Sequence, residues 1–178
     1  TYTAGAEIVT ANASFTDAAE ITAKGGAVTP PTTTPTSTGT LNAAVASDTP
    51  ASASVATGGN ANFTKFTLSA TGGDVKVKSL YVTRDGFSAN SSLTNIKVID
   101  EGGAPVGSIG SLNANSKALI SFIPSISIKS GETKTYLVRA GVVSTAQAGN
   151  TARLGFAATA DVVLESGTAG GAYPMYGN

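Results

Sequence analysis

The sequence predicts an all-β protein folded as an antiparallel β-sandwich of about seven or eight strands, with an extended N-terminal strand arm. Short runs of alternating apolar and polar residues recur along the chain, separated by turns rich in Gly, Asp and Asn. No segment combines the length and the period of an amphipathic helix. The 178 residues are 41% apolar, which suffices for one domain with a sizeable core.

The first 24 residues predict a strand-like arm that is too sparse in apolar side chains to build a core alone. Ile8, Val9, Phe15 and Ile21 stand among small and polar residues. An isolated pair of strands is marginal in water, so we expect the arm to lay these side chains against a larger body. The N-terminus lacks the basic start and apolar centre of a signal peptide, and we expect a processed chain or a piece of a longer protein.

Residues 25–39 predict an extended linker between the arm and a domain at residues 40–178. Three prolines lie among threonines there, a composition that favours polyproline II geometry. At about 3.1 Å per residue, the linker spans on the order of 40 Å. Thr32, Thr33 and Thr34 stand beside prolines and are candidate O-glycosylation sites, with a plain solvated spacer as the alternative.

Residues 62–86 predict a central pair of strands joined by a Thr-Gly-Gly-Asp turn at 71–74. Apolar residues alternate through the first strand and into the second as far as Val77. Leu80 has the opposite parity, so it reaches the same core only if one extra residue is absorbed near Ser79. We therefore expect a β-hairpin that carries a β-bulge.

Eight strands are expected between residues 40 and 164. They are 41–46, 63–70, 75–83, 95–99, 117–123, 133–142, 153–159 and 162–164. Seven or eight short strands over about 125 residues match an immunoglobulin-like (Ig-like) sandwich. The alternation places these side chains in the core: Phe66, Leu68, Val75, Val77, Leu80, Val82, Ile96, Val98, Ile120, Phe122, Tyr136, Val138, Leu154 and Phe156.

Residues 41–164 resemble the Ig-like repeat domains of prokaryotic surface-layer and other extracellular cell-surface and filament proteins. The resemblance is carried by the runs SDTPASASVATGGNANFTKFTLSATGGDVKVKSLYVTRDG, LTNIKVID, SLNANSKALISF and SIKSGETKTYLVRA. It implies an extracellular β-sandwich in a structural or adhesive protein, and it supplies no active-site residues. For the Gly-rich tail that ends in Tyr173, Met175 and Tyr176, pairing in its own sheet and docking on a neighbour both remain open.

The composition argues against several function classes. The 11 basic and 11 acidic side chains balance, so no long-range field is available to attract nucleic acid. The absence of His and Cys removes imidazole bases, thiol nucleophiles and the ordinary zinc ligands. No apolar run reaches the roughly 18 residues of a membrane span. We expect no enzymatic activity, no catalytic, cofactor-binding or metal-binding residues, and no transmembrane segment.

Two turns carry carboxylates that suit a structural calcium ion, with an ordinary turn as the alternative at both. One contains Asp85 and Asn90, and the other contains Asp100 and Glu101. In an extended chain, the adjacent carboxylates of Asp100 and Glu101 point to opposite sides, which does not suit a hydrolase pair. Separately, Asn12, Asn62 and Asn90 head Asn-X-Ser/Thr sequons and are candidate N-glycosylation sites.

The order of arm, linker and sandwich favours a structural subunit of an extracellular assembly, either a pilus-like filament or a surface layer. In this interpretation the arm adds as a strand to a neighbouring sandwich, and Ile8, Val9, Phe15 and Ile21 fill pockets there. The partners are then further copies of the chain. The alternative is an adhesin or carbohydrate-binding module that binds a cell-surface glycan and is tethered by the Thr/Pro linker.

Overall fold

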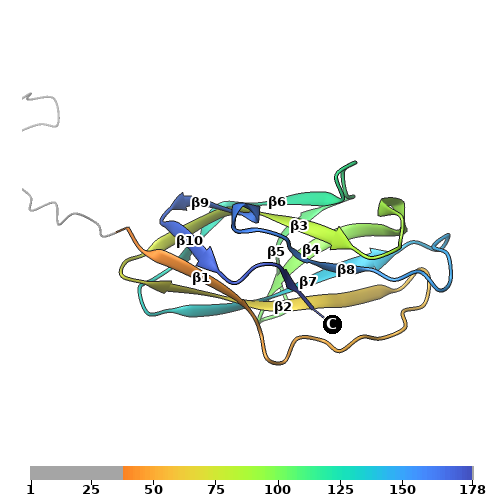
Figure 1. Ribbon diagram of the computed structural model, residues 1–178. Helices are drawn as coiled ribbons and strands as arrows, with labels where there is room; N and C mark the ends of the chain where they lie inside the picture. The colour runs from red at the N-terminus through yellow and green to blue at the C-terminus, as the bar shows by residue number, and fades with distance from the viewer. Residues whose placement is uncertain (1–37, 178) are drawn as a thin grey trace, which may run out of the picture. The chain divides into compact units, whose positions relative to one another are not determined.

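The computed structural model describes residues 38–177, which fold into two β-sheets with a shared core between them (Figure 1). The all-β prediction is confirmed, because the regular structure of these residues consists of strands and two short 3-10 turns. The arm at residues 1–24 and the linker residues 25–37 lie outside the described part.

The described residues contain eleven strands. They are β1 (Thr40–Val45), β2 (Asn60–Thr71), β3 (Val75–Asp85), β4 (Leu93–Asp100), β5 (Pro105–Ile109), β6 (Lys117–Ile128), β7 (Thr133–Val142), β8 (Arg153–Phe156), β9 (Val162–Ser166), β10 (Thr168–Gly171) and β11 (Met175–Tyr176). The 3-10 turns are η1 (Asn90–Ser92) and η2 (Thr159–Asp161). The expected strand 133–142 matches β7 at both ends. The expected strand 153–159 is too long, because the chain leaves β8 and enters η2.

The strands form a six-stranded sheet and a smaller facing sheet. The first has the order β10-β1-β2-β7-β4-β5, and the second has the order β11-β8-β3-β6, with β9 also paired to β3. Strands β1 and β10 run parallel, whereas the other pairs are antiparallel. The expected number of strands was too low, because β5, β10 and β11 are short or rich in Gly and show no apolar alternation.

The prediction that residues 62–86 form a hairpin is wrong, because its two strands do not pair with each other. Strand β2 pairs with β1 and β7 in one sheet, while β3 pairs with β6, β8 and β9 in the other. The turn between β2 and β3 therefore crosses from sheet to sheet. Each strand has one apolar face, and the crossing lets the two faces meet across the core.

The β-bulge expected near Ser79 is confirmed. Relative to β9, the register of β3 shifts between Val77 and Ser79, so Lys78 is the extra residue. The exposed Lys78 separates two buried side chains of different parity, Val77 and Leu80. The bulge therefore keeps both halves of β3 on the core, as the phase of the sequence requires.

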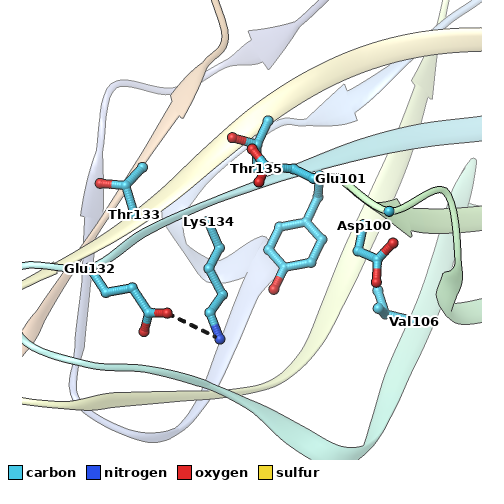
Figure 2. Close-up of a pocket in the computed structure, with 9 residues that line it drawn as sticks. Asp100, Glu101, Val106, Glu132, Thr133, Lys134 and Thr135 are labelled. Carbon is cyan, nitrogen blue, oxygen red and sulfur yellow. Dashed lines mark ion pairs between the residues drawn. The ribbon is translucent and has the colours of Figure 1, made fainter.

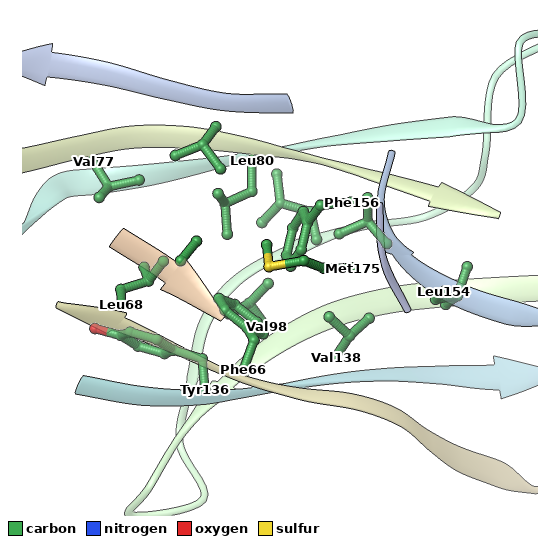
Figure 3. Packing of buried hydrophobic residues seen from close by; sticks show 14 of the residues in the cluster. Phe66, Leu68, Val77, Leu80, Val98, Tyr136, Val138, Leu154, Phe156 and Met175 are labelled. Carbon is green, nitrogen blue, oxygen red and sulfur yellow. The ribbon is translucent and has the colours of Figure 1, made fainter. Parts of the chain in front are cut away.

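The core lies between the sheets, and all fourteen side chains expected there are buried. Phe66 of β2 and Phe156 of β8 meet edge to face at its centre, with ring centroids 4.8 Å apart (Figure 3). Met175 is buried beside Phe156, its register partner in the strand pair formed by β11 and β8. The tail therefore pairs within its own domain and completes the core.

The C-terminal tail also ties the two sheets together along one side of the sandwich. Thr64 lies at a register shift in β2, and its buried hydroxyl donates a hydrogen bond to the Leu154 carbonyl of β8. The same hydroxyl accepts a hydrogen bond from the Gly177 backbone N–H at 2.6 Å. On the other side, β5 packs on the core face of β6. Gly107 permits this approach, because a Cβ there would lie 2.5 Å from Ile120 Cγ2.

Candidate functional site

Of the residues singled out in the sequence, Asn62 and Asn90 and the two acidic turns lie in the described part. The donor-arm residues Ile8, Val9, Phe15 and Ile21 lie outside it, as do Asn12, Thr32, Thr33 and Thr34.

The sequon at Asn62 has its two polar side chains in different environments. Asn62 is exposed, and its Oδ1 accepts a hydrogen bond from Arg139 Nε at 2.7 Å. The sequon hydroxyl of Thr64 is buried between the sheets and bonded to Leu154 and Gly177. In the folded domain this threonine therefore has a structural role.

Asn90 uses both ends of its side-chain amide inside the domain. Its Oδ1 accepts a hydrogen bond from Arg84 Nε at 2.7 Å, and its Nδ2 donates one to the Asn113 carbonyl at 2.9 Å. These bonds tie the loop after β3 to the loop before β6. A glycan on Nδ2 would compete with the second bond.

Both acidic turns form hydrogen bonds within the protein. Asp85 Oδ2 accepts from Arg153 Nε at 2.7 Å, so a guanidinium occupies the position next to this carboxylate. Asp100 Oδ1 accepts the Ala104 backbone N–H at 2.8 Å and closes the turn between β4 and β5. Within residues 38–177, no three acidic side chains are grouped closely enough to hold a metal ion.

The Asp100 turn and the start of β7 line a groove of about 410 Å³ (Figure 2). Lys134 lies beside the Glu132 carboxylate, with Nζ 3.5 Å from Oε1, and it donates a hydrogen bond to the Ser127 carbonyl at 2.7 Å. Asp100 and Glu101 approach the groove from the turn after β4. The groove therefore offers carboxylates, an ammonium group and threonine hydroxyls to a polar ligand.

Tyr136 lies at the groove with only 5% of its surface exposed. Burial, followed by the negative charges of Asp100, Glu132 and Glu101, raises the pKa of its phenol to about 12. Because the pKa is higher in the folded state, the unfolded chain loses the phenol proton at a lower pH than the folded chain does. The contribution of the protonated phenol to the free energy of unfolding is therefore complete below pH 10 and is lost as the pH rises toward 12.

Replacing the phenol should therefore flatten part of the alkaline stability profile. A shift of two units corresponds to about 2.7 kcal/mol, which sets the upper bound for the loss between pH 10 and pH 12. We expect Tyr136→Phe to lose less stability than the unsubstituted chain over this range in urea denaturation. Tyr81→Phe is the matched control. If stability fell equally with pH in the unsubstituted chain and in Tyr136→Phe, the raised pKa of the Tyr136 phenol would be contradicted.

Strand β6 has one edge that no other described strand pairs with. Within residues 38–177 it pairs only with β3. The backbone N–H of Arg84 donates a hydrogen bond to the backbone carbonyl of Ser116 at 2.8 Å, and this bond fixes which backbone groups of β6 face β3. In the register of the two strands, the backbone N–H and C=O groups of Ala118 and Ile120 face β3. The backbone groups of Lys117, Leu119 and Ser121 face away from β3.

Asn113 covers the first of these outward positions. Its backbone N–H donates to the Lys117 carbonyl at 2.8 Å, and its Oδ1 accepts the Lys117 N–H at 3.1 Å. No such contact covers Leu119 or Ser121 from within residues 38–177. We call the outward backbone of residues 118–123 the β6 edge.

The β6 edge also exposes large apolar side chains. Ile123 is 94% exposed and Leu119 is 39% exposed, and both lie on the outer face of the sheet, away from the core. A long unpaired edge with exposed apolar residues is a surface on which another strand can pair. The run KALISFI signals such a strand in the sequence, but the sequence does not show that one of its edges lacks a partner.

An ion pair between a buried carboxylate and a partly exposed lysine anchors the start of β6. Asp161 of η2 is 2% exposed, and its Oδ1 lies 2.5 Å from Lys117 Nζ. Its Oδ2 accepts the backbone N–H groups of Ala157 at 2.7 Å and Ala158 at 3.1 Å. This single carboxylate joins β6 to the connection between β8 and β9. Nothing in the sequence indicates that Asp161 is buried, so local patterns do not predict this role.

Comparison with known proteins gives no relative: no family model matches the chain, and neither curated proteins nor solved structures provide a significant match. In the part of the chain that the structure describes, no helix is long and apolar enough to cross a membrane.

Proposed function

We propose that this chain is a non-enzymatic structural subunit of an extracellular filament or surface layer, built from Ig-like sandwiches. Each subunit donates the strand-like arm at residues 1–24 to the sandwich of a neighbouring copy. The observation that carries the proposal is an edge of β6 that has no partner strand among residues 38–177, in a chain whose first 24 residues have a strand-like sequence pattern.

Strand addition provides both strength and order. Each added residue with outward backbone groups forms main-chain hydrogen bonds, and the alternate side chains of the arm contact the surfaces beside the edge. The donor and acceptor surfaces differ, so the contact is heterologous and repeats into a fibre unless it closes into a ring. A linker that spans on the order of 40 Å lets the arm reach a second copy.

The composition is consistent with close packing of subunits. The chain has no net charge and no Cys, so neither charge repulsion nor thiol chemistry opposes dense packing. The candidate glycosylation sites in the linker fit an extracellular location.

Removing residues 1–37 should abolish assembly and leave the sandwich folded. The deletion keeps Gly39, whose carbonyl accepts the Thr168 N–H at 2.9 Å. We expect ordered fibres or sheets from the full chain and monodisperse particles from the truncated chain, as seen by negative-stain electron microscopy and light scattering.

A full-length control separates the apolar side chains of the arm from its length. Substituting Ser at Ile8, Val9, Phe15 and Ile21 should prevent assembly as completely as the deletion does. Assembly that survives both changes would show that the arm is not the donor strand. A full chain that remains monodisperse would contradict the proposed function itself.

The groove at Tyr136 supports one alternative, an adhesin or carbohydrate-binding module. Its carboxylates, lysine and hydroxyls can form hydrogen bonds with sugar hydroxyls. Among the described residues, Phe87 is an exposed aromatic ring that can stack on a sugar, but it lies in the loop after β3 and does not line the groove. Saturable glycan-array binding by the truncated chain would favour this alternative.

A further inference from the structure

We propose that the acceptor for the donated strand is the β6 edge, and that its occupant is the part of the arm around Ile8 and Val9 of a second copy. This inference rests on the proposed function and specifies where strand addition takes place. It is carried by the backbone polarity of β6 and by the apolar surfaces on both sides of the edge.

The backbone of the β6 edge presents a defined set of groups. The N–H and C=O groups of Leu119 and Ser121 point away from β3, and Asn113 covers those of Lys117. Pro124 has no N–H and ends the run on the other side. An added strand therefore pairs between Lys117 and Pro124, a window that accommodates a segment of about five residues.

The side chains near the β6 edge suit a strand that is apolar on both faces. Successive residues of a strand point to opposite sides, so Ile8 and Val9 project in opposite directions. On the outer side, the added strand lies beside Leu119 and Ile123. On the inner side it lies next to β5, which packs against β6 and carries the half-buried Val106 and Ile109. Both arm side chains thus gain an apolar neighbour.

The other edges that lack a partner strand among residues 38–177 belong to shorter strands or lie where the sheets are joined. Strands β9, β10 and β11 have five, four and two residues. Gly167 separates β9 in one sheet from β10 in the other. Gly177, which follows β11, donates a backbone hydrogen bond to the Thr64 hydroxyl. Strand β5 has five residues and begins with Pro105. The β6 edge differs from these edges because the exposed Leu119 and Ile123 lie beside its open backbone groups.

Charge favours the same docking. Residues 1–24 carry three carboxylates and one lysine, whereas the rest of the chain carries eight carboxylates and ten basic residues. Lys78 is exposed at the bulge of β3, where that strand faces β6, and it forms no salt bridge within residues 38–177. An arm that pairs with β6 brings Glu7 toward this side of the sheet.

Charged substitutions on the edge test the inference. Leu119→Lys combined with Ile123→Lys adds two cations to exposed positions and leaves the core unchanged. We expect the concentration at which fibres form to rise at least tenfold. The matched control is Val55→Lys with Phe87→Lys, two other exposed apolar residues. Thermal unfolding by circular dichroism checks that both variants fold.

Cysteine pairing locates the contact directly, because the chain has no Cys. We would mix one copy carrying Val9→Cys with a second copy carrying Ser121→Cys, and compare this mixture with Val9→Cys plus Ser108→Cys, which probes β5. We expect a disulfide-linked dimer in the Ser121 mixture only. Crosslinking at Ser108 alone, or normal assembly of the lysine variant, would overturn the β6 assignment and leave strand donation intact. Failure of the unsubstituted chain to assemble would instead overturn the proposed function.

Discussion

Phe156→Ala is expected to lower the free energy of unfolding by about 4 kcal/mol, because it removes the ring that joins the two sheets. Phe156 is 1% exposed and packs edge to face on Phe66, with an angle of 73° between the rings. The two rings come from β8 and β2, which belong to different sheets. Strand β8 has only four residues, so its backbone pairing cannot compensate for the loss.

Urea denaturation of the truncated domain measures this effect without interference from assembly. Phe87→Ala is the matched control, since the Phe87 ring is 91% exposed and we expect less than about 0.5 kcal/mol there. A cost below about 2 kcal/mol for Phe156→Ala would mean that the surrounding side chains collapse into the space. The centre of the core would then be less rigid than the packing suggests.

Asp161→Ala is expected to cost about 3 kcal/mol, because the buried carboxylate satisfies several donors at once. It accepts the Ala157 and Ala158 N–H groups and pairs with Lys117. Removing it leaves these donors without their acceptor and releases η2 from β6. Native-state hydrogen exchange should show faster exchange at both alanine N–H groups.

Lys117→Met separates the contribution of the ion pair from that of the backbone bonds. Lys117 is partly exposed, so solvent screens its interaction with Asp161, and we expect a cost of about 1 kcal/mol or less. The two backbone hydrogen bonds to Asp161 remain in this variant. If Lys117→Met were as costly as Asp161→Ala, the charge pair and not the backbone capping would hold η2 in place.

These two substitutions also bear on assembly. Lys117 precedes the β6 edge, and its ion pair with Asp161 fixes the start of the strand. A β6 strand that frays at this end would present a less regular edge to a donor. We therefore expect Asp161→Ala to weaken fibre formation at temperatures where the domain is still folded.

The sequence alone determined the fold class and the core. The period of two showed which face of each strand is apolar, and all fourteen side chains assigned on that basis are buried. The same rule predicted a bulge near Ser79, since only an extra residue could keep Val77 and Leu80 on one core, and the structure shows that this residue is Lys78. Both results follow from local alternation, which does not depend on the partner of a strand.

Which strands pair with one another was decided by the tertiary structure. Alternation along β2 and β3 is the same whether they form a hairpin or face each other across a core, so the sequence could not exclude the hairpin. Strands β10 and β11 have too few apolar residues to show a period, and they form because they dock on β1 and β8. The burial of Asp161 depends on β6 and η2 meeting in space.

The candidate site shows the same division. The sequence predicted a strand-like arm and a β-sandwich domain, because both patterns reside in short stretches of residues. It did not indicate the proposed acceptor, since an unpaired edge is defined by what lies beside a strand. For β6, the chain places β3 on one side and none of the other described strands on the opposite side. That arrangement is a property of the assembled sheet and not of any single segment.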